Sequence, residues 1–324
     1  MTAMRRVFLI GMGTTTLTAL QSLLERFEIA GLARPAAEAD PVAGLARSRA
    51  IPITADLSVP AVGGSIRAAR PDCVVVSSYD RILPADLVAE RPFVNVHYSP
   101  LPRYRGRANV NWAILNREPS AAISIHAVEP ALDGGEILFQ REIPIGAEDT
   151  VGDLYERLNE LQRLHLGETV VRFLDGEKGR PQDERLATYG CTRLPRDGAI
   201  DWTRSAKEIT ALVRALAAPF PGAHTWLNGR KLLVWKASAP ADAPRYQGRV
   251  HGRVVRINRR DGTADVLCGD STVRLHQLQM PGEPPLAAAD ILRSVKLTLG
   301  LSVEDLLARI EGLERDLKSL KGED

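Results

Sequence analysis

Cysteine is scarce in this 324-residue chain, and its three cysteines, Cys73, Cys191 and Cys268, lie far apart. An odd number of isolated cysteines indicates neither a disulfide framework nor a zinc site, so we expect a cytoplasmic protein without a bound metal. No apolar run approaches the ~18 residues that a membrane-spanning helix needs, so we expect no membrane partner. The apolar segment at residues 5–13 has only the length of a strand, too short for a signal peptide.

Aromatic residues are also few, at 5%, so we expect aliphatic cores. The net charge is only +2, but it is unevenly distributed. Residues 205–301 carry 14 lysines and arginines against 7 acidic residues, a net charge of +7, whereas residues 1–204 carry −2 and residues 302–324 carry −3. A basic module followed by an acidic tail bears on the choice of partner, because basic surfaces attract nucleic acids and other anions.

The pattern of apolar segments divides the chain into three parts. In residues 1–204, apolar strands such as 28–34, 73–77 and 93–99 alternate with helical segments, which predicts an α/β domain with a doubly wound, mostly parallel, Rossmann-like sheet. In residues 205–300, short strands and the hairpin signals Asn228-Gly229 and Asp261-Gly262 predict a small OB-like β-barrel. Residues 301–324 form a helical tail.

The tail places Leu306, Ile310, Leu313, Leu317 and Leu320 at alternating steps of four and three residues. That spacing is typical of the apolar seam of a short coiled coil. Gly312 weakens the helix by about 1 kcal/mol relative to alanine. A homodimer through this seam and a helix packed against its own chain are both open.

The segment 93–106, FVNVHYSPLPRYRG, contains the clearest candidate for a site. Asn95 and His97 are two residues apart on a predicted strand, so both side chains point to the same face. The prolines that follow end the strand, which places the pair where α/β proteins carry their sites. A histidine that moves protons and an amide that stabilises an oxyanion suffice for direct acyl transfer, and no Gly-x-Ser-x-Gly elbow indicates a covalent route.

Other motifs are weaker. The turn GMGTTT (11–16) is an incomplete dinucleotide fingerprint, and Arg34 after the second strand could suit a 2′-phosphate. An NADP-dependent oxidoreductase rests on this turn alone, and we favour a plain strand-to-helix turn or a contact with a substrate phosphate. Arg103, Arg105 and Arg107 alternate in a loop that is either solvated or grips an anion. Asp133, in an Asp-Gly turn, and His126, in an alternating strand, do not stand out from their spacing.

Together these residues carry a resemblance. NVHYSPLPRYRG and the later ALDGGEIL resemble the formyltransferase family that uses 10-formyltetrahydrofolate, whose pattern is Asn-x-His-x-Ser-x-Leu-Pro-x-Tyr-Arg-Gly and then Leu-Asp-x-Gly-x-Ile. The segments SYDRILP (78–84), AIDW (199–202), PFPGA (219–223) and GRKLLVWKA (229–237) are similar to further landmarks of that family. The resemblance covers roughly residues 5–300.

The resemblance implies 10-formyltetrahydrofolate as co-substrate and N-formyl transfer as the reaction. It implies that Asn95 stabilises the oxyanion, that His97 moves the proton and that Asp133 orients His97 or a water. It further implies two sets of contacts: the folate with Tyr79, Ile82, Leu83 and Leu101, and the substrate with Gly13, Tyr104, Arg105 and Arg193.

The resemblance leaves the formylated amine open. We prefer a nucleotide-linked amino sugar, because YRGRANVNWAILN (104–116) resembles the sugar enzymes in Arg107, Asn111 and Trp112, and RLPRDGAIDW resembles their Arg-x-Pro-x-Asp loop. The segment 34–49 is short and has no lysine, unlike the basic insertion of methionyl-tRNA formyltransferases. The basic second module favours tRNA as the alternative. A secondary-metabolite amine, such as hydroxyornithine, and a non-catalytic nucleic-acid-binding protein are further alternatives.

Overall fold

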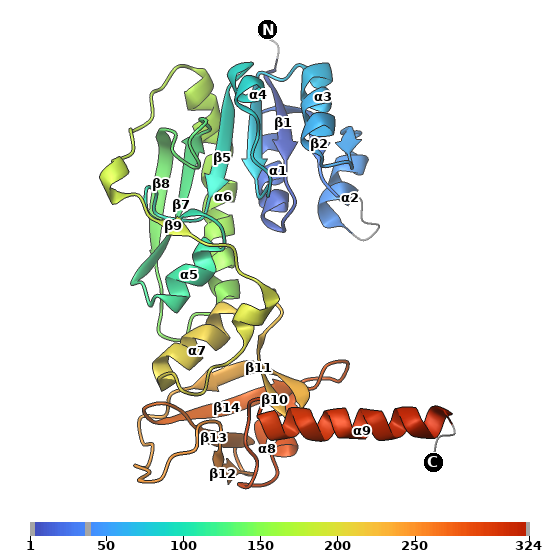
Figure 1. The fold of residues 1–324 in the computed structure, drawn as a ribbon. Helices are drawn as coiled ribbons and strands as arrows, with labels where there is room; N and C mark the ends of the chain where they lie inside the picture. The colour runs from blue at the N-terminus through green and yellow to red at the C-terminus, as the bar shows by residue number, and fades with distance from the viewer. Residues whose placement is uncertain (1–3, 36–39, 322–324) are drawn as a thin grey trace. The chain divides into compact units, whose positions relative to one another are not determined.

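The computed structural model describes residues 4–35 and 40–321, and it contains two compact units (Figure 1). The first unit holds residues 1–113, 118–146 and 153–192; the second holds residues 114–117, 147–152 and 193–324. We expected the first domain to extend to residue 204, whereas the structure assigns the chain from Arg193 onward to the second unit. Residues 36–39, in the 34–49 segment compared above with the tRNA enzymes, lie outside the described residues.

A seven-stranded sheet in the order β3-β2-β1-β4-β5-β7-β8 forms the first unit. The five strands from β3 to β5 are mutually parallel, and β7 and β8 are antiparallel. The mostly parallel, doubly wound sheet is therefore confirmed. The strands are β1 (Arg6–Ile10), β2 (Glu28–Ala33), β3 (Ile53–Thr54), β4 (Cys73–Ser77), β5 (Phe93–His97), β7 (Ser120–Ala127) and β8 (Ile137–Pro144). A separate parallel pair consists of β6 (Arg105–Gly106) and β9 (Tyr189–Gly190).

Helices cover the sheet of the first unit. On one face, Phe8, Val74 and Phe93 pack with Val62 and Leu87 from two helices. On the other, Gln162 of α6 donates to the Thr15 carbonyl at the start of α1, 2.8 Å away. The helices are α1 (Thr15–Leu24), α2 (Pro41–Ser48), α3 (Val59–Ala69), α4 (Ala85–Ala89), α5 (Asn109–Leu115) and α6 (Val151–Leu174). Strands buried on both faces explain the continuous apolar runs of β1 and β4.

The second unit is a β-sheet in the order β10-β11-β14-β13-β12, with β15 paired to β14. Leu299 bridges to Leu227 at the end of β10, and Thr298 bridges to Arg253 beside β12, so the two outer strands are joined through residues 298–299. This connection makes the sheet barrel-like, as the OB-like prediction requires. Both hairpin signals fall in turns: Asn228-Gly229 between β10 and β11, and Asp261-Gly262 between β12 and β13.

The core of the second unit is formed by the sheet and α7, with Trp202 donating to the Thr225 hydroxyl, 3.0 Å away. The strands are β10 (Ala223–Leu227), β11 (Arg230–Ser238), β12 (Val254–Asn258), β13 (Thr263–Leu267), β14 (Thr272–Gln279) and β15 (Leu286–Ala287). The helices are α7 (Ala206–Ala215), α8 (Ala288–Ile291) and α9 (Val303–Lys321), so the predicted helical tail is confirmed. Among the described helices, none is long and apolar enough to cross a bilayer.

Candidate active site

The carboxyl ends of β1, β4 and β5 bring three segments together in the first unit. The Met12 amide, in the turn after β1, donates to the Ser78 carbonyl after β4, 2.8 Å away. Ser77, the last residue of β4, pairs with Val96, next to His97 at the end of β5. Because the strand order reverses between β1 and β4, this edge is the topological switch point at which open α/β sheets bind ligands.

The alternation of β5 directs Asn95 and His97 to one face, as predicted. The antiparallel neighbour β7 adds a third polar side chain, because His126 lies opposite Asn95 in the ladder. Asn95 Nδ2 and His126 Nε2 are 3.1 Å apart, and the two imidazole rings of His97 and His126 meet edge to face. Strand pairing therefore produces a cluster of one amide and two imidazoles.

Asp133 enters this cluster from the loop between β7 and β8. Its backbone adopts a left-handed conformation with φ of 48°, which aspartate tolerates better than most residues. Two residues on, a Cβ at Gly135 would overlap the carbonyl oxygen of Ala127 at the end of β7. The Asp-Gly-Gly sequence thus lets the loop turn tightly against β7, which carries the carboxylate back over β5.

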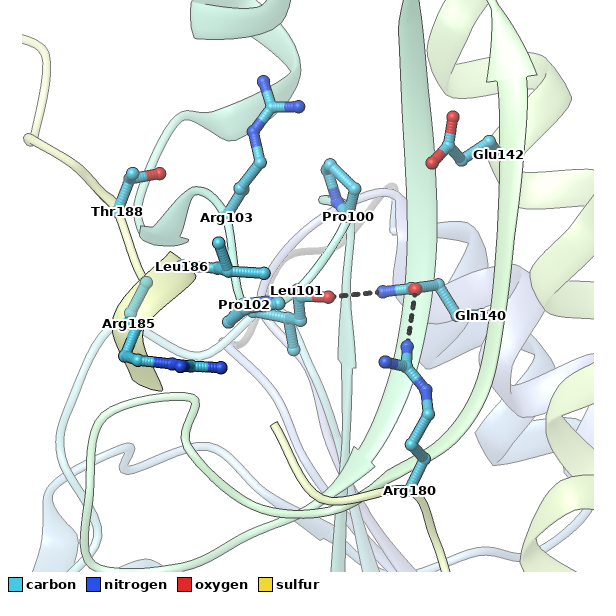
Figure 2. Close-up of a pocket in the computed structure, with 11 residues that line it drawn as sticks. Pro100, Leu101, Pro102, Arg103, Gln140, Glu142, Arg180, Arg185, Leu186 and Thr188 are labelled. Atoms are coloured by element: carbon cyan, nitrogen blue, oxygen red, sulfur yellow. Dashed lines mark hydrogen bonds between the residues drawn. The ribbon is translucent and has the colours of Figure 1, made fainter. Parts of the chain in front are cut away.

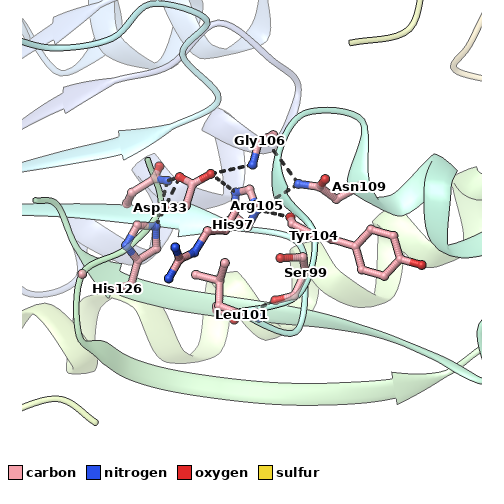
Figure 3. A network of polar contacts seen from close by, with 12 residues as sticks. His97, Ser99, Leu101, Tyr104, Arg105, Gly106, Asn109, His126 and Asp133 are labelled. Atoms are coloured by element: carbon pink, nitrogen blue, oxygen red, sulfur yellow. Dashed lines mark hydrogen bonds and ion pairs between the residues drawn. The ribbon is translucent and has the colours of Figure 1, made fainter. Parts of the chain in front are cut away.

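The Asp133 carboxylate contacts the other residues of the cluster (Figure 3). Its Oδ2 accepts a hydrogen bond from the Gly106 amide at 2.8 Å and lies 3.8 Å from Nδ1 of His97. Its Oδ1 accepts from Asn95 Nδ2 at 3.4 Å and lies 3.7 Å from Nε2 of His126. The carboxylate can therefore stabilise a positive charge on His97 electrostatically.

His97 is 7% exposed, and its Nε2 atom has two different partners. The Tyr104 carbonyl, 2.9 Å away, accepts a hydrogen bond when Nε2 carries a proton. The Asn109 amide nitrogen, 2.8 Å away, donates one when Nε2 does not. Each protonation state of Nε2 has a matching partner, a property suited to a group that gains and loses a proton.

His126 is 1% exposed and stays neutral at physiological pH. Burial lowers its pKa to about 4, and the nearby His97 contributes to this shift. Its Nδ1 donates to the Ala127 carbonyl, 2.8 Å away, which leaves Nε2 as an acceptor for the Asn95 amide. His126 therefore sets which way round the Asn95 amide lies.

Arg105 stabilises the loop that carries Asp133 through Gln182. Its guanidinium is bound to the Glu184 carboxylate at 2.6 Å and 2.8 Å and to the Gln182 side-chain oxygen at 2.8 Å. The Gln182 amide in turn donates to the carbonyls of Asp133 and Gly135, each 2.7 Å away. Arg105, predicted as a substrate contact, is only 1% exposed, and its guanidinium is engaged by Glu184 and Gln182.

The residues expected to contact folate have different exposures. Ile82 is 81% exposed and Leu101 only 2% exposed, while Tyr79 and Leu83 are half-buried against the core of the first unit. The Tyr79 hydroxyl donates to the Leu57 carbonyl, 2.9 Å away, and burial raises the pKa of Tyr79. Residues 78–84 form an irregular loop that begins beside the end of β5.

Gly13, another predicted substrate contact, lies in the glycine turn after β1. Arg34 donates to the carbonyls of Gly11 and Gly13 and forms a buried ion pair with Asp40, whose pKa this hydrogen bond lowers. Arg34 therefore stabilises the glycine turn and is not available to bind a 2′-phosphate. The dinucleotide interpretation needs that arginine, so the structure does not support it.

Tyr104 presents its carbonyl to His97 but directs its hydroxyl to Glu118, 2.5 Å away. Arg193 belongs to the second unit, where it donates to the Asp197 carbonyl, 2.7 Å away.

A cavity of about 470 Å³ adjoins the loop that follows β5 (Figure 2). Its lining includes Leu101 but not Asn95, His97 or Asp133. Gln140 donates to the Leu101 carbonyl at 2.9 Å and accepts from Arg180 at 3.1 Å. Arg103 and Arg185, also in the lining, are paired with carboxylates, whereas Arg180 donates to the uncharged Gln140 side chain.

Sequence reasoning missed three residues of this site: His126, Asn109 and Gln182. His126 comes opposite Asn95 only through the register of an antiparallel pair, and Gln182 reaches Asp133 across 49 residues of chain. Within the described ranges no group of three or more histidine, cysteine or acidic side chains could hold a metal ion.

A doubly wound sheet with an amide, imidazoles and a carboxylate at its switch point is the architecture of an acid–base group-transfer enzyme. A family model described as formyl transferase matches residues 25–170, and one for the formyl transferase C-terminal domain matches residues 194–296. The chain is 33% identical over 265 residues to methionyl-tRNA formyltransferase of Geobacter sulfurreducens, covering 80% of this chain and 81% of that one. The chain belongs to the formyltransferase family.

Two solved structures share the fold. HypX of Aquifex aeolicus, determined with tetrahydrofolic acid, has a TM-score of 0.66 at 17% identity, over 90% of this chain and 48% of HypX. This chain thus spans about half the length of HypX. A sugar N-formyltransferase from Shewanella sp. FDAARGOS_354 has a TM-score of 0.59 at 19% identity, over 74% of this chain and 100% of that one.

The first prediction concerns Gly135. In Gly135→Ala the new methyl group overlaps the Ala127 carbonyl and displaces the Asp133 loop, so we expect a loss of about 1–3 kcal/mol in the free energy of unfolding. Chemical denaturation measures it. Gly64→Ala is the control, because a Cβ at Gly64 in α3 meets nothing within 4 Å. Equal stability of the two variants would contradict the close packing of this loop.

The second prediction concerns pH. Because the pKa of His126 is about 4 in the folded protein and about 6.5 when unfolded, the unfolded chain binds more protons between these values. Stability is then lost as pH falls from about 6.5 to about 4, by up to about 3 kcal/mol. His126→Gln keeps an acceptor for Asn95 but cannot titrate, so its loss should be smaller. Denaturation of both proteins at pH 7 and pH 4.5 tests this, since all other groups are shared; equal losses would refute it.

Proposed function

We propose that the protein transfers the formyl group of 10-formyltetrahydrofolate to a primary amine, and that this amine is the methionyl group of methionyl-tRNA. The observation that supports the chemistry best is the contact of Asp133 with both Asn95 and His97. The sequence relatives support tRNA as the acceptor over the nucleotide-linked amino sugar that the loop motifs suggested.

The loop 78–84 offers the backbone groups that a folate ring requires. Among the described residues, the backbone N–H and C=O groups of Ile82 and Leu83 form no hydrogen bonds, although Leu83 is half-buried. Pterins are flat and present a row of donors and acceptors along one edge, which such groups can match. This loop begins beside the end of β5, so a folate bound there would lie near Asn95 and His97. When bound, it supplies the formyl group.

His97 is proposed to move the proton that the amine loses. Its Nε2 can hold a proton against the Tyr104 carbonyl or release it and accept from Asn109. Asp133, 3.8 Å from Nδ1, favours the charged ring electrostatically. Histidine is suited to this role because its ordinary pKa lies near neutrality.

Asn95 is proposed to stabilise the negative charge that develops on the formyl oxygen. One of its amide hydrogens is used by His126 at 3.1 Å; the other makes only a long contact of 3.4 Å with Asp133. The second hydrogen is the one available to a substrate oxygen, because a 3.4 Å contact with Asp133 is weak and the hydrogen can be shared with a second acceptor. His126 keeps the amide from rotating while this happens.

The tRNA acceptor has two supports. A methionyl-tRNA formyltransferase aligns with four-fifths of this chain at 33% identity. The second unit also contains the basic segment 205–301, with a net charge of +7, and contacts with phosphates dominate affinity for nucleic acid.

A nucleotide-linked amino sugar is the second candidate, favoured by Arg107, Asn111 and Trp112. Arg107 is exposed, whereas Asn111 is 1% exposed and the Trp112 indole donates to the Cys191 carbonyl, 2.9 Å away. Only Arg107 is thus free to reach a diphosphate.

The third prediction tests the acceptor. Formylation with 10-formyltetrahydrofolate should consume methionyl-tRNA and leave a panel of nucleotide-linked amino sugars unchanged. Activity on tRNA should fall steeply with salt, because phosphate contacts are screened. Turnover of a sugar nucleotide, with methionyl-tRNA untouched, would overturn the tRNA assignment and leave the formyl-transfer chemistry intact.

The fourth prediction tests the roles within the site. His97→Ala and Asp133→Ala should each lower kcat by about 10²–10⁴-fold, the usual contribution of general acid–base catalysis, with little change in melting temperature for His97→Ala. His165→Gln, on α6, is the control histidine and should retain full activity. Retained turnover in His97→Ala would remove the proton-transfer role.

A further inference from the structure

Helix α9 carries a row of exposed apolar side chains. Its apolar side chains occupy two positions of a heptad: Val303, Ile310 and Leu317 at the first, and Leu306, Leu313 and Leu320 at the second. Their exposed fractions run from 45% for Leu306 to 86% for Leu320. The alternative of a helix packed along its own chain is therefore not what the structure shows.

We propose that two copies of this chain associate through α9 as a parallel, two-stranded coiled coil. Burying a large aliphatic side chain contributes about 1.5–3 kcal/mol, so an apolar row of this length favours a partner with the same periodicity. A second copy supplies that periodicity by symmetry. This proposal is independent of the acceptor and of the formyl-transfer chemistry.

The residue types at the seam specify the arrangement. Position a, the first of the heptad, holds the β-branched residues Val303 and Ile310 and then Leu317, whereas position d holds leucine in all three heptads. β-Branched residues at a together with leucine at d favour two parallel strands over three or four.

The flanking charges fit the same arrangement. In a parallel pair, the residue that precedes a in one helix faces the residue that follows d five positions later in the other. Arg309 then faces Glu314 of the second copy, and Asp316 faces Lys321. Both pairs are attractive, and each occurs twice by symmetry. In an antiparallel pair Arg309 would instead face Asp316. The two arrangements therefore differ in which acidic residue, Glu314 or Asp316, pairs with Arg309.

The association should be moderate and concentration-dependent. A helix of 19 residues is about 28 Å long, and it contains fewer than three full heptads. Gly312 lies on the outer face, where it lowers helix stability without touching the seam. Exposed ion pairs add only about 0–1 kcal/mol each, so the apolar seam supplies most of the affinity.

Sedimentation equilibrium of the full chain over a range of concentrations tests the seam. The mass should rise from 35.3 kDa towards twice that value. Leu313→Glu places two carboxylates against each other in the seam and should yield a monomer throughout. Ala308→Glu adds the same charge on the outer face of α9 and should dimerise as the unaltered chain does. A monomer at every concentration, or a dimer that survives Leu313→Glu, would overturn the proposal.

Charge exchange tests the orientation. Arg309→Glu alone should raise the dissociation constant about tenfold, since two attractive pairs become repulsive. Adding Glu314→Arg should restore it in a parallel pair. Restoration by Arg309→Glu with Asp316→Arg instead would overturn the parallel arrangement. The melting temperature of every variant should match that of the unaltered chain, because α9 contributes to neither core.

Discussion

The site depends on one carboxylate, that of Asp133, held 12% exposed between two strands. A charge withdrawn from water needs partners, and among the residues that the structure describes only the Gly106 amide forms a short hydrogen bond with it, at 2.8 Å. The remaining stabilisation comes from the Asn95 amide at 3.4 Å and the His97 imidazole at 3.8 Å. Each of these groups is consequently oriented towards the charge, and the carboxylate organises the acid–base pair.

The surrounding structure holds this carboxylate in place. Gly106 presents its amide from a short strand whose pairing with β9 leaves no room for a side chain, since a Cβ there would come within 2.9 Å of the Gly190 carbonyl. Arg105, its neighbour, ties Gln182 to the backbone of the Asp133 loop. The arginine and glycine of the Tyr-Arg-Gly sequence therefore both act on Asp133 across the loop.

Much of this arrangement follows from the sequence, because it arises from local periodicity. The two-residue period of a strand put Asn95 and His97 on one face. The change from long apolar strands to short hairpins along the chain marked the boundary between the sheet and the barrel. Asp133 was found only through resemblance to a family, because an Asp-Gly turn has an ordinary local explanation. His126, Asn109 and Gln182 could not be found, since their contacts depend on strand register and on loops distant in sequence. Arg105 was expected to contact a substrate because arginines beside the Asn95–His97 pair could grip an anion. Its partners Gln182 and Glu184, 77 and 79 residues away, leave no local trace in the sequence.

The residues proposed to carry out formyl transfer and the residues proposed to select the acceptor lie in different parts of the chain. The proposed formyl transfer needs a nucleophilic amine, an oxyanion donor and a proton carrier, and these requirements are the same for an aminoacyl group and for an amino sugar. The geometry of the cluster around Asp133 therefore does not distinguish between the two acceptors. What separates the candidates is the exposed Arg107 after β6 and the basic segment 205–301 of the second unit, and neither belongs to the cluster of Asn95, His97 and Asp133. A change of acceptor would then require new residues outside this cluster, and one fold can serve proteins with different acceptors.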